Sequence, residues 1–327
     1  MKKDTSREFP RPVVVVSKCL EFASCRFNGL RISDEFVRAL KDFVKFKKVC
    51  PEVEIGMGIP RDPIRVVQSG DVPKLMQPAS GKDFTTHMNR FGKKYLTGLD
   101  DVDGFILKSR SPSCGIKDVK IYAAVDSKQS LGKQAGFFGQ SVMDHFPHAA
   151  IEDEGRLTNF RIREHFLTKL YTLATFRKVT KSRSMAELVM FQATNKLLFM
   201  AYNQKEMRLM GKVVANHERL KFDEVIALYE THLHRSLDTV ARYTSHINVL
   251  MHAGGYFSKQ LSPAERKYFL EAIDDYRDAK IPLSALLSII KSWIARFGQT
   301  YLASQTYFEP YPIGLVEITD SGKGRDL

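Results

Sequence analysis

Hydrophobic positions in the first half of the chain fall into short β-branched or aromatic runs, separated by segments with helical spacing. Residues 13–16 are four valines and residues 103–107 form a similar run, so both are predicted to be buried strands. Residues 33–43 and 85–96 carry apolar side chains at helical spacing, which predicts amphipathic helices. Further short strands are predicted at residues 48–49, 64–67 and 149–151. This alternation predicts an α/β domain with a mostly parallel sheet.

The second half of the chain shows only helical periodicity. Apolar residues recur at helical spacing over residues 185–203, 206–216 and 222–237. Pro263 and Pro282 stand where two further helices are expected to begin, since proline is favoured in the first helical turn. The sequence therefore predicts an all-α second domain. The expected domains are residues 1–155 and 156–327.

The charge of the chain points to an anionic partner. The net charge is +13 over 327 residues, and residues 161–221 alone contain thirteen Lys or Arg against four Asp or Glu. An excess of this size suits a polyanion such as nucleic acid. A basic surface without a partner is the alternative interpretation of the same count.

Neither membrane insertion nor secretion is expected. No apolar run approaches the roughly 18 residues that a bilayer-spanning helix needs. Residues 1–12 are charged, unlike a secretory signal. Four cysteines are few for a chain of this length, so we expect a reducing, cytoplasmic compartment and no disulfide framework.

The positions of the cysteines indicate thiol or metal chemistry in the first domain. All four lie within the first 114 residues, and Cys19, Cys50 and Cys114 each follow a predicted strand. Ligands bind beyond the carboxyl ends of strands in open α/β sheets, so these three thiols are expected to converge there. Cys25 lies in a predicted turn and is left out of this set. Three thiolates suit a [4Fe-4S] cluster with one open iron, or a zinc ion with one open position. Buried structural cysteines are the alternative.

An acidic residue follows the second of these cysteines. Glu52 lies two residues after Cys50, so both side chains could reach one pocket. Gly56 and Gly58 allow the backbone conformations and close approaches that other residues resist. The alternative is a structural cysteine and a solvated glutamate at the end of a strand.

Three blocks of the first domain, in this order, resemble the bacterial thiouracil desulfidases. The matching residues are Ser17-Lys18-Cys19-Leu20 with Cys25-Arg26-Phe27-Asn28-Gly29, then Cys50-Pro51-Glu52-Val53 with Gly56-Met57-Gly58-Ile59-Pro60-Arg61 and Ile64-Arg65, and finally Leu107-Lys108 with Ser111-Pro112-Ser113-Cys114-Gly115. The second domain resembles the helical YbgA-like domain, with matches that include His252-Ala253, Gly255-Tyr256-Phe257 and Ile281-Pro282-Leu283. The fused pair resembles the branch that removes sulfur from 4-thiouridine in tRNA.

The resemblance implies an iron-sulfur-dependent desulfidase that converts 4-thiouridine to uridine in tRNA. It implies that Cys19, Cys50 and Cys114 hold a [4Fe-4S] cluster, whose fourth iron takes the sulfur of the thiobase while water supplies the replacing oxygen. Such a replacement needs proton transfer at the site. We expect Glu52 to be the acid/base and Ser111 to be the hydroxyl that assists it.

Further residues of these blocks are candidates for substrate binding. Arg61 and Arg65 could hold the base or a phosphate, with an ion pair that supports the loop as the alternative. Lys108 could neutralise negative charge near the cluster, or it could be a solvated lysine. Ser113 could contact the substrate or shape the Pro-Ser-Cys turn.

The helical domain offers candidates for contact with tRNA phosphates. Basic residues are expected to share one helix surface at Lys196, Lys205, Arg208 and Lys212. The domain departs from its family pattern, because histidines are replaced at Gln192, Asn195 and Asn203. If those histidines bound a metal or transferred protons, this chain has lost that role. If they made hydrogen bonds, Gln and Asn could substitute for them.

Two other functions are compatible with the same residues. One is a desulfidase of free thiouracil or thionucleosides, which would leave the helical domain for oligomerisation or regulation. The other is a non-catalytic RNA-binding or redox-sensing protein. No oligomeric state is predicted.

Overall fold

The computed structural model describes residues 7–70 and 72–317, which divide into two compact units. The first unit runs to Thr175 and includes the described residues from Gly314, and the second comprises Phe176–Ile313. The long helix α5 (Phe160–Ser182) contributes residues to both. The domain boundary expected between residues 155 and 156 stays a prediction.

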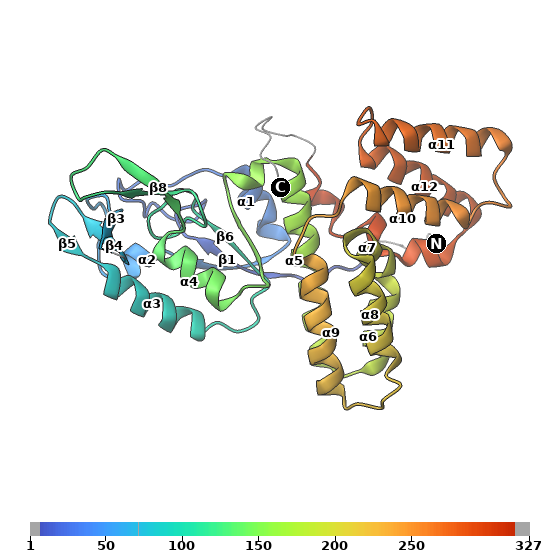
Figure 1. The fold of residues 1–327 in the computed structure, drawn as a ribbon, viewed down its shortest axis with the longest axis horizontal. Helices are drawn as coiled ribbons and strands as arrows, with labels where there is room; N and C mark the ends of the chain where they lie inside the picture. Colours follow the sequence, from blue (N-terminus) through green and yellow to red (C-terminus); the bar gives the residue numbers. More distant parts are fainter. Residues whose placement is uncertain (1–6, 71, 318–327) are drawn as a thin grey trace. The chain divides into compact units, whose positions relative to one another are not determined.

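A four-stranded parallel sheet forms the centre of the first unit (Figure 1). Its strand order is β2-β1-β6-β9, with bounds β1 Val13–Ser17, β2 Lys45–Val49, β6 Gly104–Leu107 and β9 Ala150–Asp153. All strand pairs in it are parallel. The central strands β1 and β6 are buried along their whole length, which explains their uninterrupted apolar sequences. The predicted α/β class with a mostly parallel sheet is confirmed.

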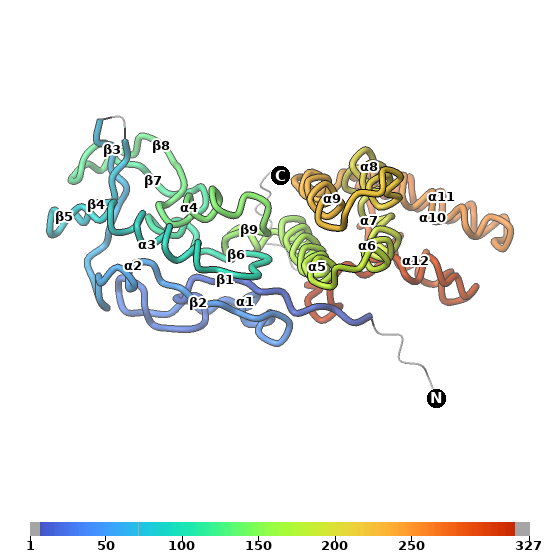
Figure 2. The backbone as a smooth tube through the Cα atoms, turned by 90° about the horizontal axis from the view of Figure 1, so that it is seen from below, coloured from blue at the N-terminus to red at the C-terminus, as the bar shows by residue number. Residues whose placement is uncertain are grey.

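A second sheet lies beside the first and is largely antiparallel. Its order is β5-β4-β3-β7-β8, with bounds β3 Arg65–Ser69, β4 Val72–Gln77, β5 Lys82–Asp83, β7 Val119–Tyr122 and β8 Ser130–Gln134. The strand expected at 64–67 therefore exists as β3, but it belongs to this sheet. Gly70 has a φ of 61° and allows β3 and β4 to reverse as a hairpin, so no helical crossover separates them. Figure 2 shows β3, β7 and β8 next to one another.

The two sheets share one hydrophobic core with α3 Thr85–Thr97 and α4 Phe137–His145. The shorter helices of the first unit are α1 Glu35–Ala39 and α2 Pro51–Glu54, and 3₁₀ turns lie at Leu40–Asp42 and Arg156–Thr158. The core brings together Phe105 of β6, Val66 of β3, Met88 of α3 and Phe138 of α4, all fully buried. The loops at the ends of the strands in both sheets are thus held by one common core.

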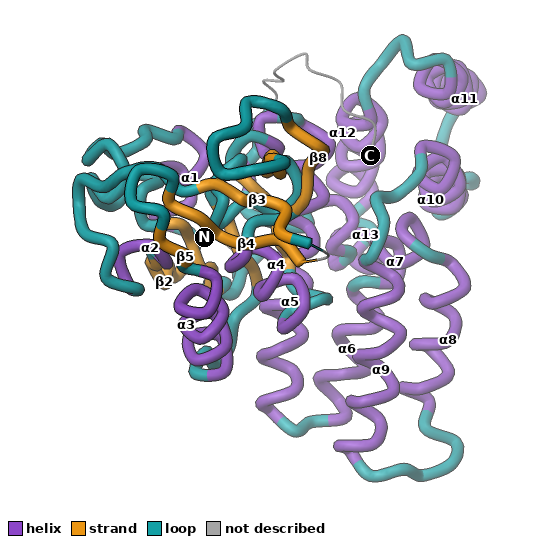
Figure 3. Tube along the Cα trace, turned by 60° about the vertical axis from the view of Figure 1, so that its left-hand side comes forward, coloured by secondary structure: helices purple, strands orange, loops and turns teal. Residues whose placement is uncertain are grey.

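The second unit is all-helical, as predicted (Figures 1 and 3). Its elements after α5 are α6 Met185–Thr194, α7 Lys196–Tyr202, α8 Gln204–Ala215, α9 Phe222–Leu237, α10 Tyr243–Gly255, α11 Pro263–Arg277, α12 Leu283–Phe297, α13 Thr300–Ser304 and a 3₁₀ turn at Thr306–Phe308; a further turn, Ile313–Leu315, ends the series. Ser262 and Glu265 form the capping box at the start of α11. Within the described part of the chain, no helix is both long and apolar enough to cross a membrane.

The helix predicted over residues 185–203 is two helices. Asn195 interrupts it, because its side-chain amide donates to the carbonyl of Phe191 (2.8 Å) and its carbonyl accepts from the hydroxyl of Thr306 (2.7 Å). Lys196 consequently lies on α7, whereas Lys205 and Arg208 lie on α8. The expectation that all of them share one helix surface is wrong for Lys196.

The polar residues that replace the family histidines are all hydrogen-bonded. The carbonyl of Gln192 accepts from the hydroxyl of the buried Tyr229 (2.6 Å), and its amide donates to the carbonyl of Met207 (3.2 Å). The side chain of Asn203 caps α8 by accepting from the backbone N–H of Glu206 (3.2 Å). Asn195 makes the two bonds described above. The structure therefore agrees with the hydrogen-bonding alternative for these positions.

Candidate active site

The ends of three adjacent strands carry the loops that contain the predicted thiols. Ser17, the last residue of β1, is level with Val49 at the end of β2. Its hydroxyl accepts from the backbone N–H of Lys108, directly after β6 (2.9 Å), and it lies close enough to the thiol of Cys114 to influence the pKa of that thiol. The parallel register thus brings loops that are distant in sequence to one edge of the sheet, as expected.

All four cysteines are buried and none forms a disulfide. The thiol of Cys25 lies close enough to those of Cys19 and Cys50 for both to influence its pKa, and the Cys50 Sγ lies 3.8 Å from the carbonyl oxygen of Cys25. Cys114 is close enough to Cys50 to interact with it electrostatically. Cys19, Cys25, Cys50 and Cys114 are called the thiol group below.

Cys25, which the sequence analysis leaves out of the ligand set, is buried close to two members of that set. A tight turn after Cys19 returns the chain, with Gly29 at a φ of 71° and a bridge between Leu20 and Ile32. The turn brings Cys25 back among the other thiols instead of to the surface. Its separation of six residues from Cys19 was the available signal in the sequence.

The surroundings of Cys25, Cys50 and Cys114 favour their protonated thiols in the absence of a cation. Burial raises the pKa of Cys114 to about 12. The neighbouring thiol of Cys25, together with burial, raises the pKa of Cys50, and the neighbouring thiol of Cys19 raises the pKa of Cys25. Soft thiolates can be stabilised here by a metal, which releases their protons on binding.

The cysteines supply soft sulfur donors, the type of ligand that an iron-sulfur cluster takes. Among residues 7–70 and 72–317, no group of three or more His, Cys, Asp or Glu side chains is arranged to hold one metal ion. In a [4Fe-4S] cluster each thiolate binds a different iron, so the sulfurs need not converge on one point. Buried, unbridged thiols from three loops match this requirement.

Glu52 lies beside the thiol group at the start of a short helix. Cys50 is the residue before α2, and Pro51 occupies the first position of this helix. Glu52 is therefore the second residue of α2, two residues after the Cys50 thiol. One carboxylate oxygen accepts from the Ser113 hydroxyl (2.6 Å), and the other pairs with the guanidinium of Arg61 (2.7 Å). The side chains of both Glu52 and Arg61 are largely buried, at 13% and 4% exposed.

The two serines extend this arrangement into a chain of polar groups. The hydroxyls of Ser111 and Ser113 lie 2.9 Å apart. When Ser113 gives its single proton to Glu52, its oxygen can accept the proton of Ser111. Ser113 therefore lies between the expected acid/base and the expected assisting hydroxyl, a place that sequence reasoning did not give it. We call Glu52, Ser113 and Ser111 the proton chain.

Arg61 holds the site together. Its guanidinium donates to the carbonyls of Gly58 (2.9 Å) and Cys25 (3.0 Å) besides pairing with Glu52. The backbone N–H of Arg61 donates to the carbonyl of Phe27 (2.8 Å). The structure thus shows the loop-supporting ion pair that was the alternative for this residue, and contact with substrate stays a prediction.

Lys108 is neither solvated nor directed at open space. Its ammonium forms a short ion pair with Glu154 and donates to the backbone and hydroxyl of Ser109 (3.0 Å each). Glu154 in turn accepts from the N–H of Ser109 (2.7 Å). The charge of Lys108 is thus already matched by a carboxylate, which makes the solvated alternative wrong.

Arg65 does not join the thiol group. It begins β3 in the second sheet, where its guanidinium donates to the carbonyls of Val125 (3.1 Å) and Ser127 (3.0 Å). Lys196, Lys205 and Arg208 are exposed residues of the second unit. Their contact with substrate stays a prediction.

The loop that carries Ser111, Ser113 and Cys114 is fixed by the start of α4. Backbone N–H groups from Gly136 to Gly139 donate to carbonyls of this loop, at 2.7 Å for Gly136 to Gly115 and 2.8–2.9 Å for Phe138 and Gly139 to Ser113. The first N–H groups of a helix have no partner within it, so the loop supplies the missing acceptors.

Comparison with known proteins places both parts of the chain. Residues 14–154 match the family model described as 2-thiouracil desulfurase, and residues 196–312 match one described as a protein of unknown function, DUF1722. The chain is 33% identical over 110 residues to the uncharacterized protein YbbK of Bacillus subtilis, which covers 32% of this chain and 73% of YbbK. The chain belongs to the 2-thiouracil desulfurase family. Its helical part is of the DUF1722 type.

Two further matches extend this picture. The uncharacterized protein YbgA of Escherichia coli is 32% identical over 163 residues, covering 50% of this chain and 86% of YbgA. Among solved structures, a [4Fe-4S]-dependent thiouracil desulfidase, TudS, matches at 25% identity and a TM-score of 0.35, covering 45% of this chain and 93% of TudS.

Gly139→Ala is expected to destabilise the active-site loop. A Cβ at this position would lie 2.3 Å from the carbonyl oxygen of Gly115 and 2.8 Å from that of Cys114, both backbone atoms that cannot move aside alone. We expect the free energy of unfolding to fall by about 3 kcal/mol, even though alanine favours a helix by about 1 kcal/mol. Urea denaturation measures the change.

Gly132→Ala is the matched control, because a Cβ there meets nothing within 4 Å. Its unfolding free energy should stay within about 0.5 kcal/mol of the parent. Equal stability of the two variants would show that the contact between α4 and the loop does not constrain the site.

Proposed function

We propose that the chain is a [4Fe-4S]-dependent desulfidase that converts 4-thiouridine in tRNA to uridine in the cytoplasm. The observation that carries the proposal is the position of the proton chain directly beside the thiol group, through Glu52 next to Cys50 and Ser113 next to Cys114. Membership of the 2-thiouracil desulfurase family supports removal of sulfur from a thiolated base.

The thiols would provide the cofactor site. Cys19, Cys50 and Cys114 would hold the cluster, which supplies an open, soft iron with affinity for thiocarbonyl sulfur. Cys25 touches two of these ligands and packs the site against water. The Ser17 and Ser113 hydroxyls contact the Cys114 sulfur and help to hold it in place.

The proton chain would manage the protons of the reaction. Replacing C=S by C=O consumes one water and releases hydrogen sulfide, so both protons must leave the water oxygen. A proton taken up at Ser111 can pass through Ser113 to Glu52, because each oxygen lies within 3 Å of the next. Arg61 keeps the carboxylate in the position that accepts it.

The charge of the helical unit supports RNA as the carrier of the base. Lys205, Arg208 and Lys212 recur at spacings of three and four along α8 and therefore share one face. None of the three forms an ion pair with any described residue. A row of unmatched cations suits a polyanion.

Free thiouracil or a free thionucleoside is the second candidate substrate. The name of the matching family favours it, since it specifies 2-thiouracil and not an RNA. The two candidates share the chemistry of the site and differ in the use of the helical unit.

The cluster assignment predicts about four irons per chain after anaerobic reconstitution. The Cys19→Ala/Cys50→Ala/Cys114→Ala variant should lose this iron together with its visible absorption, because the ligands are removed. Iron and sulfide analysis measures both. Cys25→Ala is the matched control and should keep its iron. Iron-free parent protein would end the desulfidase proposal.

Glu52→Gln should slow desulfidation of thiolated tRNA by about 100- to 10,000-fold at unchanged iron content, because an amide cannot accept the proton. Ser113→Ala interrupts the same chain and should also slow the reaction, whereas Ser130→Ala on the exposed strand β8 should not. Loss of the thiouridine absorption follows the rate. Full activity of Glu52→Gln would remove Glu52 from the mechanism.

The RNA assignment predicts that binding of tRNA weakens steeply with salt, whereas desulfidation of free 4-thiouridine does not. Lys205→Gln/Arg208→Gln should make the slope of log affinity against log salt shallower by about 1.5–2. Lys259→Gln/Lys291→Gln, which removes two exposed lysines elsewhere in the unit, is the control. Identical slopes for both variants would favour the free thiobase.

A further inference from the structure

A cavity of about 690 Å³ opens on the second sheet of the first unit. Its walls come from the start of β3, the turn after β4, the strands β7 and β8, and the loop before Ser111. The volume is within the range of small-molecule sites. Of the candidate site residues named above, Arg65 lines it.

The charges that line this cavity are strongly unbalanced. Four cationic side chains line it, and Asp118 is the one carboxylate among the lining residues. The cations are Arg65, Arg110, Lys120 and Lys133. Asp118 lies 3.5 Å from Lys133, whereas Arg65, Arg110 and Lys120 form no ion pair with any described residue. We call this space the basic cavity.

Two of these cations face each other across a pair of strands, and one carboxylate, Asp118, is paired with one of them. Lys120 of β7 and Lys133 of β8 are directly opposite each other in the antiparallel ladder. Like charges in such a pair repel and destabilise the sheet. An anion bound between them removes this cost.

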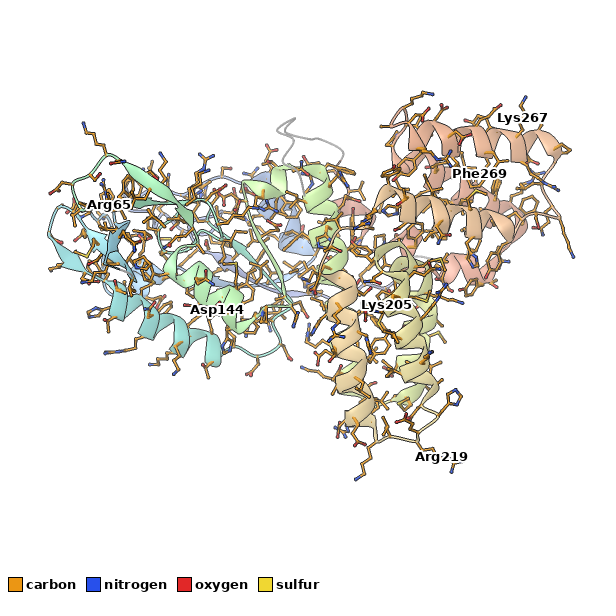
Figure 4. All side chains as sticks on the ribbon, viewed as in Figure 1. Arg65, Asp144, Lys205, Arg219, Lys267 and Phe269 are labelled. Carbon is orange, nitrogen blue, oxygen red and sulfur yellow. The ribbon has the colours of Figure 1, made fainter. Side chains whose placement is uncertain are left out.

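Arg65 is fixed in a position ready to bind. One of its terminal nitrogens donates to the carbonyls of Val125 and Ser127, and the guanidinium lies over the Tyr122 ring at 4.5 Å from the centroid. Its other terminal nitrogen has no hydrogen bond to a described residue. An arginine held in this way loses little entropy when it binds a phosphate. Figure 4 labels this residue.

The basic cavity adjoins the proton chain. Arg110 and Pro112 line it, and between them stands Ser111. Arg110 has a φ of 58°, a left-handed conformation that is strained for a residue other than glycine and that is concentrated at functional sites. A ligand that reaches both places needs a base at Ser111 and an anionic group in the cavity, as a nucleotide has.

We propose that the basic cavity binds a phosphate group of the nucleotide, or of the RNA strand, whose thiolated base enters the active site. The identity of the base rests on the proposed function, whereas the binding of phosphate rests on the cavity itself. Its place in the first unit makes it separate from the basic face of α8.

The test compares two probes that lack sulfur, uridine 5′-monophosphate and a short single-stranded RNA, with full-length protein. Arg110→Gln/Lys120→Gln should weaken binding about tenfold, as expected for lost charge-assisted contacts. For the RNA, the slope of log affinity against log salt should become shallower by about 1.4, since single strands give about 0.7 for each neutralised phosphate. Fluorescence anisotropy and calorimetry provide the affinities.

The matched control is Lys93→Gln/Lys94→Gln, which removes the same charge from an exposed part of α3. It should change neither the affinity nor the slope. An effect of the cavity variant on both probes assigns the phosphate of a single nucleotide, and an effect on the RNA alone assigns a backbone phosphate. If the cavity variant and the control behave alike, the proposal is wrong.

These outcomes are independent of desulfidation, because the probes carry no sulfur and binding needs no turnover. If the cavity variant binds both probes normally while the parent protein is an active desulfidase, the phosphate proposal is wrong and the proposed function stands. If the cavity binds phosphate but the protein is iron-free and inactive, the phosphate proposal stands and the proposed function is wrong.

Discussion

The contact between the start of α4 and the loop of residues 111–115 is the constraint on which the site depends. It satisfies two sets of backbone groups together: the unpaired N–H groups of a helix and the carbonyls of a loop with little secondary structure. The helix has glycine at both ends of the contact, Gly136 and Gly139, where any Cβ would meet a backbone oxygen. Because this loop carries Ser111, Ser113 and Cys114, the hydroxyls and one thiol are placed by backbone geometry.

Among the described residues of the first unit, the cationic side chains at the active site are paired with carboxylates, whereas most of those around the basic cavity are not. At the active site, Arg61 is paired with Glu52 and Lys108 with Glu154, so neither cation is left to attract an anion. The basic cavity is the opposite case, with four cations around one carboxylate. This division would suit the substrate proposed above, which has an uncharged base and an anionic phosphate.

The sequence predicted the features that depend on local pattern, and it missed those that depend on contacts between distant residues. Strand ends could be read from apolar runs, and the loops that carry Cys19, Cys50 and Cys114 do leave from one edge of the sheet, as the registers of β1, β2 and β6 show. The position of Cys25 depends on the pairing of Leu20 with Ile32, which no local sequence pattern predicts. Likewise, Ser113 could be placed next to Glu52 only once α2 and the loop after β6 were known to meet, 61 residues apart. The break at Asn195 depends on Thr306, far along the chain.

The anchoring of α4 on the loop also has an evolutionary consequence. Residues 116–135 leave from the end of that loop and return to the start of the helix, so both ends of this excursion are fixed within a few ångströms of each other. The excursion contains β7 and β8, and with them the opposed lysines. Insertions or substitutions there can reshape what the protein recognises without displacing the groups that react. Recognition and chemistry can therefore diverge independently within one small domain.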